Sequence, residues 1–502
     1  MKVFFSRGLT PISWACLMLI ALVIVLFLPW RFQVNDDEAM MWLISGSYTG
    51  EPESYAVFIH PIMSWVLAKL YRGFPNFPWY PIIWFSILYF SFLAVVRLNH
   101  QKFGKRRIAQ IWNLLFFAFI LHFAFFLQFS IVSALALSAG LAYRFWRFSK
   151  EDLQIKKWFK SDVLILLGFL VRPEVGYLLI AGFVGFGIIF GWSKFFLRAA
   201  VIPLILFLIG SAFSLFWIQK ADKEEFVQLN HLRSAVFDHP FLQLEKEYWK
   251  LEKPDLYYFS NGLQDFEQDR LDAKVLSSWK QDLDQARIPL ISFSFYKKAL
   301  FTYIEKEHFF IFLWIVLILY SIAINSWKSA LVSFLIFAGF LVLAPFFLLK
   351  VQIYALAFLL FAFFMILIQN STIPISTFTN YSLLTLLILA IGFHLISFFK
   401  SFENIPEDTE IQNQLTLLEK EEFERIFLIG EHKFYHELVF QNPLPFQIMG
   451  WPSLLNSFEN QSHHSKTAYL VQKNTFRNNI AYFEARGGVF TYLEDFVLVK
   501  IP

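Results

Sequence analysis

The chain has 502 residues, of which 57% are hydrophobic, 20% aromatic and 16% charged, and its net charge is +4 at neutral pH. This composition excludes an ordinary water-soluble protein, because a soluble core cannot hold so many apolar side chains. The small positive charge does not indicate nucleic-acid binding, since Lys and Arg gather in short segments between apolar stretches. We therefore expect a membrane protein with membrane lipid, and no nucleic acid, as a partner.

The first apolar stretch follows a basic start that contains Lys2 and Arg7. This arrangement is similar to a signal peptide, but no small-residue cleavage site follows, so we expect a retained anchor. Cys16 lies inside this stretch and is the single cysteine of the chain. A disulfide or a thiolate metal cluster within one chain is therefore excluded.

Apolar stretches that are long enough to cross a bilayer recur along the chain. A spanning helix needs about 20 residues and satisfies its own backbone hydrogen bonds. We expect helices over residues 12–31, 80–97, 109–127, 130–146, 161–172, 174–191, 199–218, 307–325, 329–348, 351–369 and 381–399. The pattern predicts an all-α polytopic membrane protein with about eleven transmembrane helices.

Basic residues predict the orientation of these helices. Residues 97–107, 144–160, 192–198 and 326–329 form short, mostly basic connections, which the positive-inside rule places in the cytoplasm together with the N-terminus. Loops 32–79 and 219–306 and the C-terminal part then lie outside, as expected for a multi-pass protein of a bacterial inner membrane. Lys350 conflicts with the rule, so the topology of the last three helices stays open.

The sequence predicts two domains. Residues 1–400, including the two outer loops, would form the transmembrane domain. Residues 401–502 read as a small extracytoplasmic α/β domain, with an acidic helix, an apolar run from Ile426 to Ile429 and an alternating run from Val489 to Ile501. This second domain contains no cofactor fingerprint that we can identify.

The acidic cluster Asn35-Asp36-Asp37-Glu38 follows the first helix directly. A carboxylate beside a low-dielectric wall can have a raised pKa and accept a proton from a substrate hydroxyl. Adjacent carboxylates could also bind a divalent cation such as Mg²⁺ or Mn²⁺ through their oxygens. The alternative interpretation is a solvated acidic loop that only helps to orient the chain.

The layout of the chain resembles that of the C-type (GT-C) membrane glycosyltransferases. The shared features are the acidic cluster after the first helix, about eleven spans and an outer C-terminal domain. The resemblance is best in the first hundred residues, which contain Ser45-Gly46, Thr49-Gly50-Glu51-Pro52, Leu70-Tyr71, Phe74-Pro75 and Trp79-Tyr80. It extends to the protein O-mannosyltransferases and the aminoarabinose transferases, and it implies an inverting transferase with Asp36, Asp37 or Glu38 as catalytic base.

The tripeptide Arg172-Pro173-Glu174 lies between the fifth and sixth expected spans. Proline would end or kink a helix there. An arginine at membrane depth indicates a functional site, and its guanidinium suits the phosphate of a lipid-linked sugar donor. The alternative is a simple ion pair between Arg172 and Glu174 that stabilises a hairpin.

Two further groups could support the site. Asn230 and Arg233 would share a helix face just after the seventh span, with Asp238 nearby, and Arg233 could supply a second cation to the donor. A surface salt bridge is the alternative interpretation. His60 could orient a carboxylate or assist proton transfer, or could simply be solvated. The outer histidines lack metal-ligand spacing, so we expect no metal site from them.

These observations favour a glycosyltransferase that moves a sugar from a polyprenyl-phosphate donor to an envelope glycan, lipid or protein on the outer face. Such an enzyme needs no nucleotide-binding fold, because its donor arrives in the membrane and its leaving group is a lipid phosphate. The alternatives are a glycan polymerase or ligase, a transporter or flippase, and a noncatalytic envelope-assembly protein. A transporter would be expected to show two related halves with paired broken helices.

Overall fold

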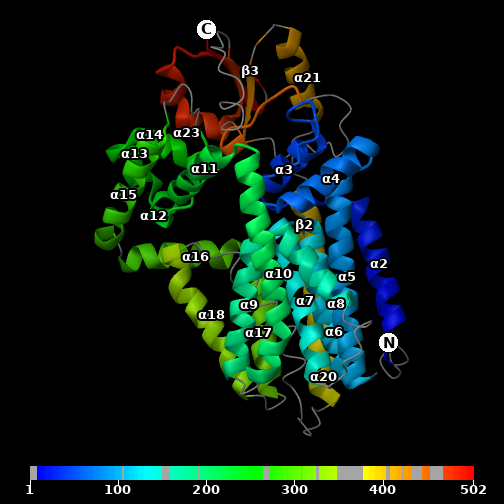
Figure 1. Ribbon diagram of the computed structural model, residues 1–502. Coiled ribbons are helices and arrows are strands. Elements are labelled where there is room, and N and C mark those ends of the chain that lie inside the picture. Colours follow the sequence, from blue (N-terminus) through cyan, green and yellow to red (C-terminus); the bar gives the residue numbers. More distant parts are fainter. Residues whose placement is uncertain are drawn as a thin grey trace.

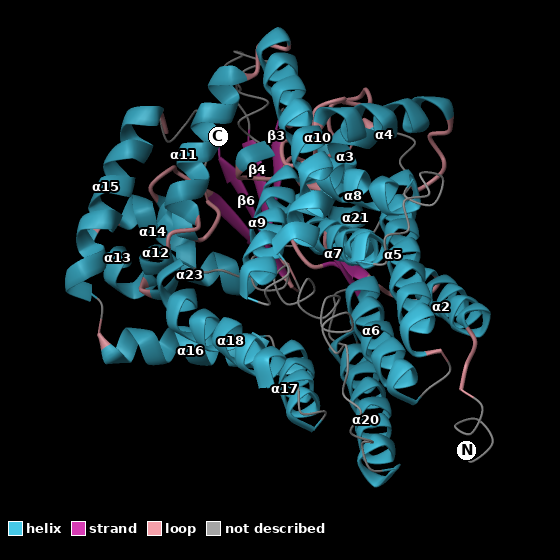
Figure 2. Cartoon of the chain, turned by 60° about the horizontal axis from the view of Figure 1, so that its bottom comes forward, coloured by secondary structure: helices cyan, strands magenta, loops and turns pink. Residues whose placement is uncertain are grey.

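The computed structural model describes most of the chain, and the bounds below refer to these residues. The described residues are 8–104, 107–149, 159–189, 193–263, 271–290, 292–306, 308–323, 327–347, 377–402, 408–420, 423, 425–430, 444–452, 467–493 and 495–501. The molecule is mostly helical, and its few strands form one sheet and one short pair (Figure 2).

A body of roughly aligned helices forms the lower part of the molecule (Figure 1). It contains α2 (Pro11–Leu26), α5 (Trp79–Phe103), α6 (Arg107–Phe125), α7 (Phe129–Ser149), α8 (Phe159–Val171), α9 (Pro173–Ile189), α10 (Ser193–Lys220), α17 (His308–Ala323), α18 (Trp327–Phe347) and α20 (Thr377–Phe402). Within the described residues, ten of the expected spans each overlap one of these helices, although α2 ends at Leu26 and not at residue 31, and the expected span 351–369 lies outside the described residues.

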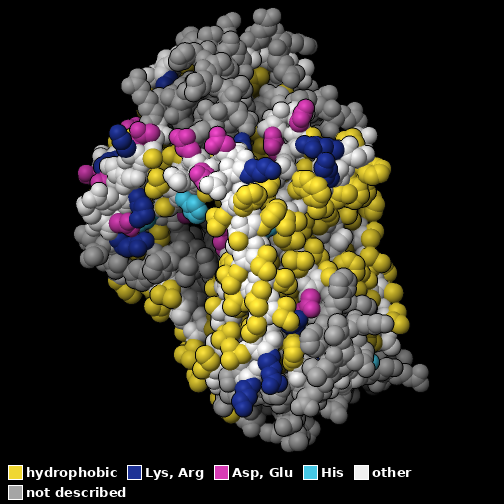
Figure 3. Space-filling model, in the orientation of Figure 1, with side chains coloured by type: hydrophobic (Ala, Val, Ile, Leu, Met, Phe, Trp, Pro, Cys, Tyr) yellow, Lys and Arg dark blue, Asp and Glu magenta, His cyan; other side chains and the backbone are white. Residues whose placement is uncertain are grey.

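Five helices among the described residues are long and apolar enough to cross a membrane, by length and composition. They lie within α5, α6, α7, α10 and α20, and four shorter apolar helices accompany them. In Figure 3 hydrophobic side chains cover the helical body in a broad band, with charged side chains gathered above it and at its lower end. This distribution suits a body surrounded by lipid. The total of about eleven crossings stays a prediction.

Close helix contacts hold the centre of the body together. A side chain on Gly140 of α7 would meet Ile165 of α8, and one on Gly168 of α8 would meet Leu137 of α7. Small residues of this kind let two helix backbones approach closely in a membrane. The buried Arg144 of α7 also pairs with Asp162 of α8. As a result α7 and α8 form a closely packed pair.

A short parallel strand pair brings the first outer loop to the start of α7. Strand β1 (Arg31–Phe32) pairs with β2 (Phe126–Leu127), so that Arg31 lies opposite Phe126. The amide of Gln33 continues the pairing by donating to the carbonyl of Leu127 at 2.9 Å. The helix that follows β1, α3 (Asn35–Ser45), therefore begins beside the N-terminus of α7.

Shorter helices lie at the upper end of the body and beside it on the left, with α16 at about mid-height (Figure 1). They are α3, α4 (Pro61–Gly73), α11 (Glu224–Phe237), α12 (Pro240–Leu244), α13 (Lys246–Glu252), α14 (Pro254–Ser260), α15 (Ala273–Leu290) and α16 (Phe293–Lys306). The two segments that were expected to be outer loops thus fold largely as helix. Together with the C-terminal part they form a polar layer above the apolar body.

The C-terminal part contains a four-stranded sheet in the order β3-β4-β6-β5. Its elements are α21 (Asp408–Lys420), β3 (Arg425–Ile429), β4 (Thr467–Gln472), α23 (Lys473–Glu484), β5 (Val489–Tyr492) and β6 (Phe496–Ile501). The pair β3–β4 is parallel, whereas β4–β6 and β5–β6 are antiparallel. The expected small α/β unit is therefore present. The domain boundary at residue 401 stays a prediction. Residues from before this boundary contribute to the core of the sheet, since Leu263 is buried in its hydrophobic cluster and Tyr258 packs against that cluster.

Candidate active site

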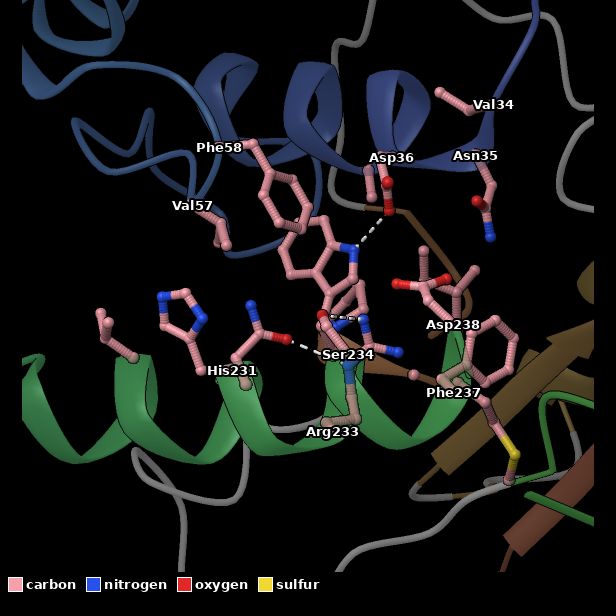
Figure 4. Close-up of a pocket in the computed structure, with 18 of the residues that line it drawn as sticks. Val34, Asn35, Asp36, Val57, Phe58, His231, Arg233, Ser234, Phe237 and Asp238 are labelled. Atoms are coloured by element: carbon pink, nitrogen blue, oxygen red, sulfur yellow. Dashed lines mark hydrogen bonds between the residues drawn. The ribbon is translucent and has the colours of Figure 1, made fainter. Parts of the chain in front are cut away.

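A cavity of about 520 Å³ lies between five separate parts of the chain. These parts are the start of α3 with the loop after it, the junction of α8 and α9, helix α11, Gly262 after α14, and residues 448–452 before β4. Figure 4 shows Asp36 above the cavity, on α3, and Arg233 and Asp238 opposite it, at α11. The polar side chains of its wall are Asn35, Asp36, Arg172, Glu174, Asn230, His231, Arg233, Ser234 and Asp238.

Asp36 is the carboxylate of the acidic cluster that lines the cavity. It lies in the first turn of α3 and is partly exposed. One of its oxygens, Oδ1, accepts a hydrogen bond of 2.8 Å from the indole nitrogen of Trp451. The predicted position of an acid at the wall of a site is therefore found at this residue.

Asp37 and Glu38 do not line the cavity. Both side chains are buried, with 0% and 4% of their surface exposed. Successive residues of a helix point about 100° apart, so three neighbours cannot all face one cavity. The carboxylate of Asp37 accepts hydrogen bonds from the Tyr80 hydroxyl at 2.9 Å and from the amide of Phe129 at 3.2 Å. Asp37 therefore ties α3 to α5 and to the start of α7, and of the three acids only Asp36 lines the cavity.

The pH dependence of stability should reveal the buried state of Asp37. Burial raises the pKa of Asp37 well above its ordinary value, against the hydrogen bonds from Tyr80 and Phe129. A raised folded-state pKa gives a contribution to stability that is complete below the unfolded value of about 3.9 and is lost as the pH rises through the folded value. The melting temperature in detergent of the wild type should therefore fall with rising pH relative to that of Asp37→Asn, which cannot titrate there. Parallel melting curves at all pH values would contradict this expectation.

Arg172 lies in the break between two helices, as the sequence predicts. Helix α8 ends at Val171 and α9 begins at Pro173. The guanidinium donates to the Ser130 hydroxyl at 2.7 Å and lies 4.8 Å from the centre of the Phe129 ring. Its Nε is 3.6 Å from a carboxylate oxygen of Glu174. The ion pair of the alternative interpretation is therefore present, and Arg172 also lines the cavity, while its role toward a phosphate stays a prediction.

Arg233 is a buried cation at the opposite wall. Its Nε donates to the Asn230 side chain at 3.0 Å, and another nitrogen donates to the Ser234 hydroxyl at 3.3 Å. The expected shared face of α11 is therefore found. Burial lowers the pKa of Arg233, while the charges of Asp36 and Asp238 oppose that change. With 7% of its surface exposed, Arg233 does not form the surface salt bridge of the alternative interpretation.

Asp238 ends α11 and adds a third carboxylate to the cavity, after Asp36 and Glu174. Burial raises the pKa of Asp238, Arg233 and Arg172 lower it, and Asp36 raises it. The cavity wall thus contains three carboxylates and two guanidinium groups, and Glu174 is paired with Arg172. Charges interact more strongly in a partly buried site of this kind than in water.

His60 does not assist a carboxylate, and this expectation is wrong. The side chain is buried at the N-terminus of α4, where Nδ1 accepts a hydrogen bond of 3.2 Å from the amide of Ile62. Nε2 lies 2.9 Å from the carbonyl oxygen of Gly210 and donates to it. Both ring nitrogens are therefore used by backbone groups, and His60 links α4 to α10.

Trp451 and Ser130 contact site residues that the sequence singled out, but neither was predicted. Trp451 is 415 residues away from Asp36, and Ser130 is 42 residues from Arg172. No local pattern in the sequence connects such distant positions. Within the parts of the chain that the structure describes, no three His, Cys, Asp or Glu side chains are placed so that they could hold a metal ion together.

Comparison with known proteins gives a likeness of fold. No protein-family model matches the chain, and no curated protein matches it. Two crystal structures of ArnT from Cupriavidus metallidurans, one bound to undecaprenyl phosphate and one in the apo state, are each 12% identical to it. Each alignment covers 97% of this chain and 98% of the other, with a TM-score of 0.43. So distant a likeness leaves the function to be argued from the cavity.

Proposed function

We propose that this chain is a membrane glycosyltransferase that moves a sugar from a polyprenyl-phosphate donor to a glycan, lipid or protein acceptor. The observation that carries the proposal is one cavity in which Asp36, Arg172 and Arg233 meet, although they come from three distant segments. The transfer needs a base for the acceptor and cations for the phosphate, and this cavity offers both. It lies at the polar end of an apolar helical body, where a lipid-linked donor would present its head group.

The chemistry follows from these groups. The acceptor hydroxyl gives its proton to the Asp36 carboxylate, and its oxygen forms a bond to the anomeric carbon of the sugar. The bond between that carbon and the phosphate oxygen breaks, and the polyprenyl phosphate leaves with the electron pair. Because the attack comes from the side opposite the leaving group, the anomeric configuration inverts. Guanidinium groups suit the leaving phosphate because they can bind two of its oxygens at once.

The residues assigned to these steps keep the roles that the sequence suggested. Asp36 is the base, and Arg172 and Arg233 bind the phosphate, with Arg233 oriented by Asn230. Glu174 holds Arg172 at the edge of the cavity. We further propose that the cavity faces the extracytoplasmic side of a bacterial inner membrane, since Lys and Arg side chains gather at the lower end of the helical body (Figure 3) and the positive-inside rule assigns such residues to the cytoplasm.

A donor panel tests the proposal. The purified protein is incubated in membranes with radiolabelled polyprenyl-phosphate sugars and native envelope extract, and release of sugar from each donor is followed. The wild type should consume one donor, Asp36→Asn should not, and Asp255→Asn, which changes an exposed carboxylate of α14, should match the wild type. Consumption of no donor by the wild type would overturn the proposal and favour the transporter or scaffold interpretation.

A further inference from the structure

The C-terminal sheet is tied to α3 by the segment that contains residues 444–452. The amide of Leu444 donates to the carbonyl of Ser47 at 2.6 Å, just after α3. The amide of Gln447 donates to Ile426 of β3 at 2.7 Å, and the amide of Leu428 donates back to Gln447 at 3.0 Å. The segment is thus fixed to the first outer loop at Leu444 and to the sheet at Gln447.

This segment places Trp451 at the wall of the cavity. Gly450 has a φ of +107°, a backbone conformation that favours glycine, and the chain turns there. The indole of Trp451 is 4% exposed and packs edge-on against Phe58, with ring centres 5.7 Å apart. Its nitrogen donates to Oδ1 of Asp36 at 2.8 Å (Figure 4). An indole donates a hydrogen bond but cannot accept a proton, so its contact orients the carboxylate without competing for the proton of a substrate.

A second attachment fixes the sheet on the other side of the cavity. The side-chain amide of Asn261, which follows α14, donates to the side-chain oxygen of Asn479 in α23 at 2.9 Å. The rings of Tyr258 and Tyr482 lie 5.3 Å apart, and Leu263 is buried in the sheet's own hydrophobic cluster. The sheet therefore lies against α3 and α14, and residues from both attachments line the cavity.

We propose that Trp451 is a positioning residue for Asp36, and that the C-terminal sheet unit thereby builds part of the active site. A hydrogen bond to one carboxylate oxygen fixes the orientation of the group and leaves the other oxygen for the acceptor hydroxyl. The expected effect of Trp451 on kcat rests on the proposed function, whereas its effect on the orientation of the Asp36 carboxylate does not. These two effects can therefore be measured separately.

The experiment compares Trp451→Phe with Trp451→His. Phenylalanine keeps a ring but has no N–H, whereas histidine can place an N–H two bonds from Cγ, as the indole does. Trp451→Phe removes a hydrogen bond to a charged group and should therefore lower kcat by roughly tenfold or more. The KM of the donor should change less than about twofold, because binding is not affected. Trp451→His should recover part of the lost kcat.

A second readout needs no transferase activity. A water-soluble carbodiimide modifies accessible carboxylates, and peptide mass spectrometry gives the rate of modification at Asp36. This rate should rise several-fold in Trp451→Phe and return toward the wild-type rate in Trp451→His. Trp249→Phe is the matched control, because Trp249 is an equally buried indole whose N–H donates at 3.1 Å to Phe241, outside the cavity wall.

The outcomes are distinct. Unchanged modification of Asp36 in Trp451→Phe, or an equal change in Trp249→Phe, would overturn the positioning role. A raised KM with unchanged kcat would also overturn it, since Trp451 would then contact substrate instead. If the modification rate rises as expected but the wild type consumes no donor, the proposed function fails and the positioning of Asp36 by Trp451 stands.

Discussion

Asp36→Asn is expected to lower kcat by about 10²–10⁴-fold, the usual contribution of a general base. The amide of asparagine keeps the size of the side chain and can still accept from Trp451, but it cannot take a proton. The KM of the donor should change little, because the phosphate is bound by Arg172 and Arg233 on other walls of the cavity. Initial rates at varied donor and acceptor concentrations measure both quantities.

Two controls separate catalysis from folding. Asp37→Asn changes a buried link between α3 and α7 and should act mainly on melting temperature. Asp255→Asn changes an exposed carboxylate and should have no effect. If Asp36→Asn keeps the wild-type kcat, Asp36 is not the base, and Asp238, the other carboxylate beside Arg233, becomes the residue to replace.

The helical body was predictable because its physical signal is local. A helix in lipid must be apolar over about 20 residues, and that requirement can be read from each segment by itself. The break at Pro173 was predictable for the same reason, since proline cannot continue the helix of its predecessor. The shared face of Asn230 and Arg233 also follows from their spacing of three residues.

The sequence could not predict which of Asp36, Asp37 and Glu38 lines the cavity, because the answer depends on partners that are distant in the chain. The sequence places three acids together, but the rotation of α3 is set by the pairing of β1 with β2. The backbone amide of Phe129, at the start of α7, donates a hydrogen bond to Asp37, and the indole of Trp451 donates one to Asp36. The predicted role of His60 beside a carboxylate was wrong for a related reason, since its hydrogen-bond partner, the carbonyl of Gly210, lies 150 residues away in the chain.

Replacement of Arg233 is the second change with a large expected effect. Arg233→Met removes a buried cation and keeps a side chain of similar length, so binding of polyprenyl phosphate should weaken by about 10²-fold or more, as expected for the loss of two charge-assisted hydrogen bonds. Arg233→Lys keeps the charge but not the paired donors, and its affinity should be intermediate. Equilibrium binding of labelled polyprenyl phosphate measures the effect without turnover. Arg477→Met, at an exposed position of α23, is the matched control.

Loss of Arg233 also leaves Asp238 without a cation that lowers its pKa, so the variant should be less stable as well. Asp238→Asn, added to Arg233→Met, removes that unbalanced carboxylate and should restore much of the melting temperature. It should not restore binding, because the donors for the phosphate are still missing. If binding returns together with stability, Arg233 holds the fold of α11 and the phosphate is bound elsewhere. If only stability returns, the guanidinium itself is the phosphate ligand.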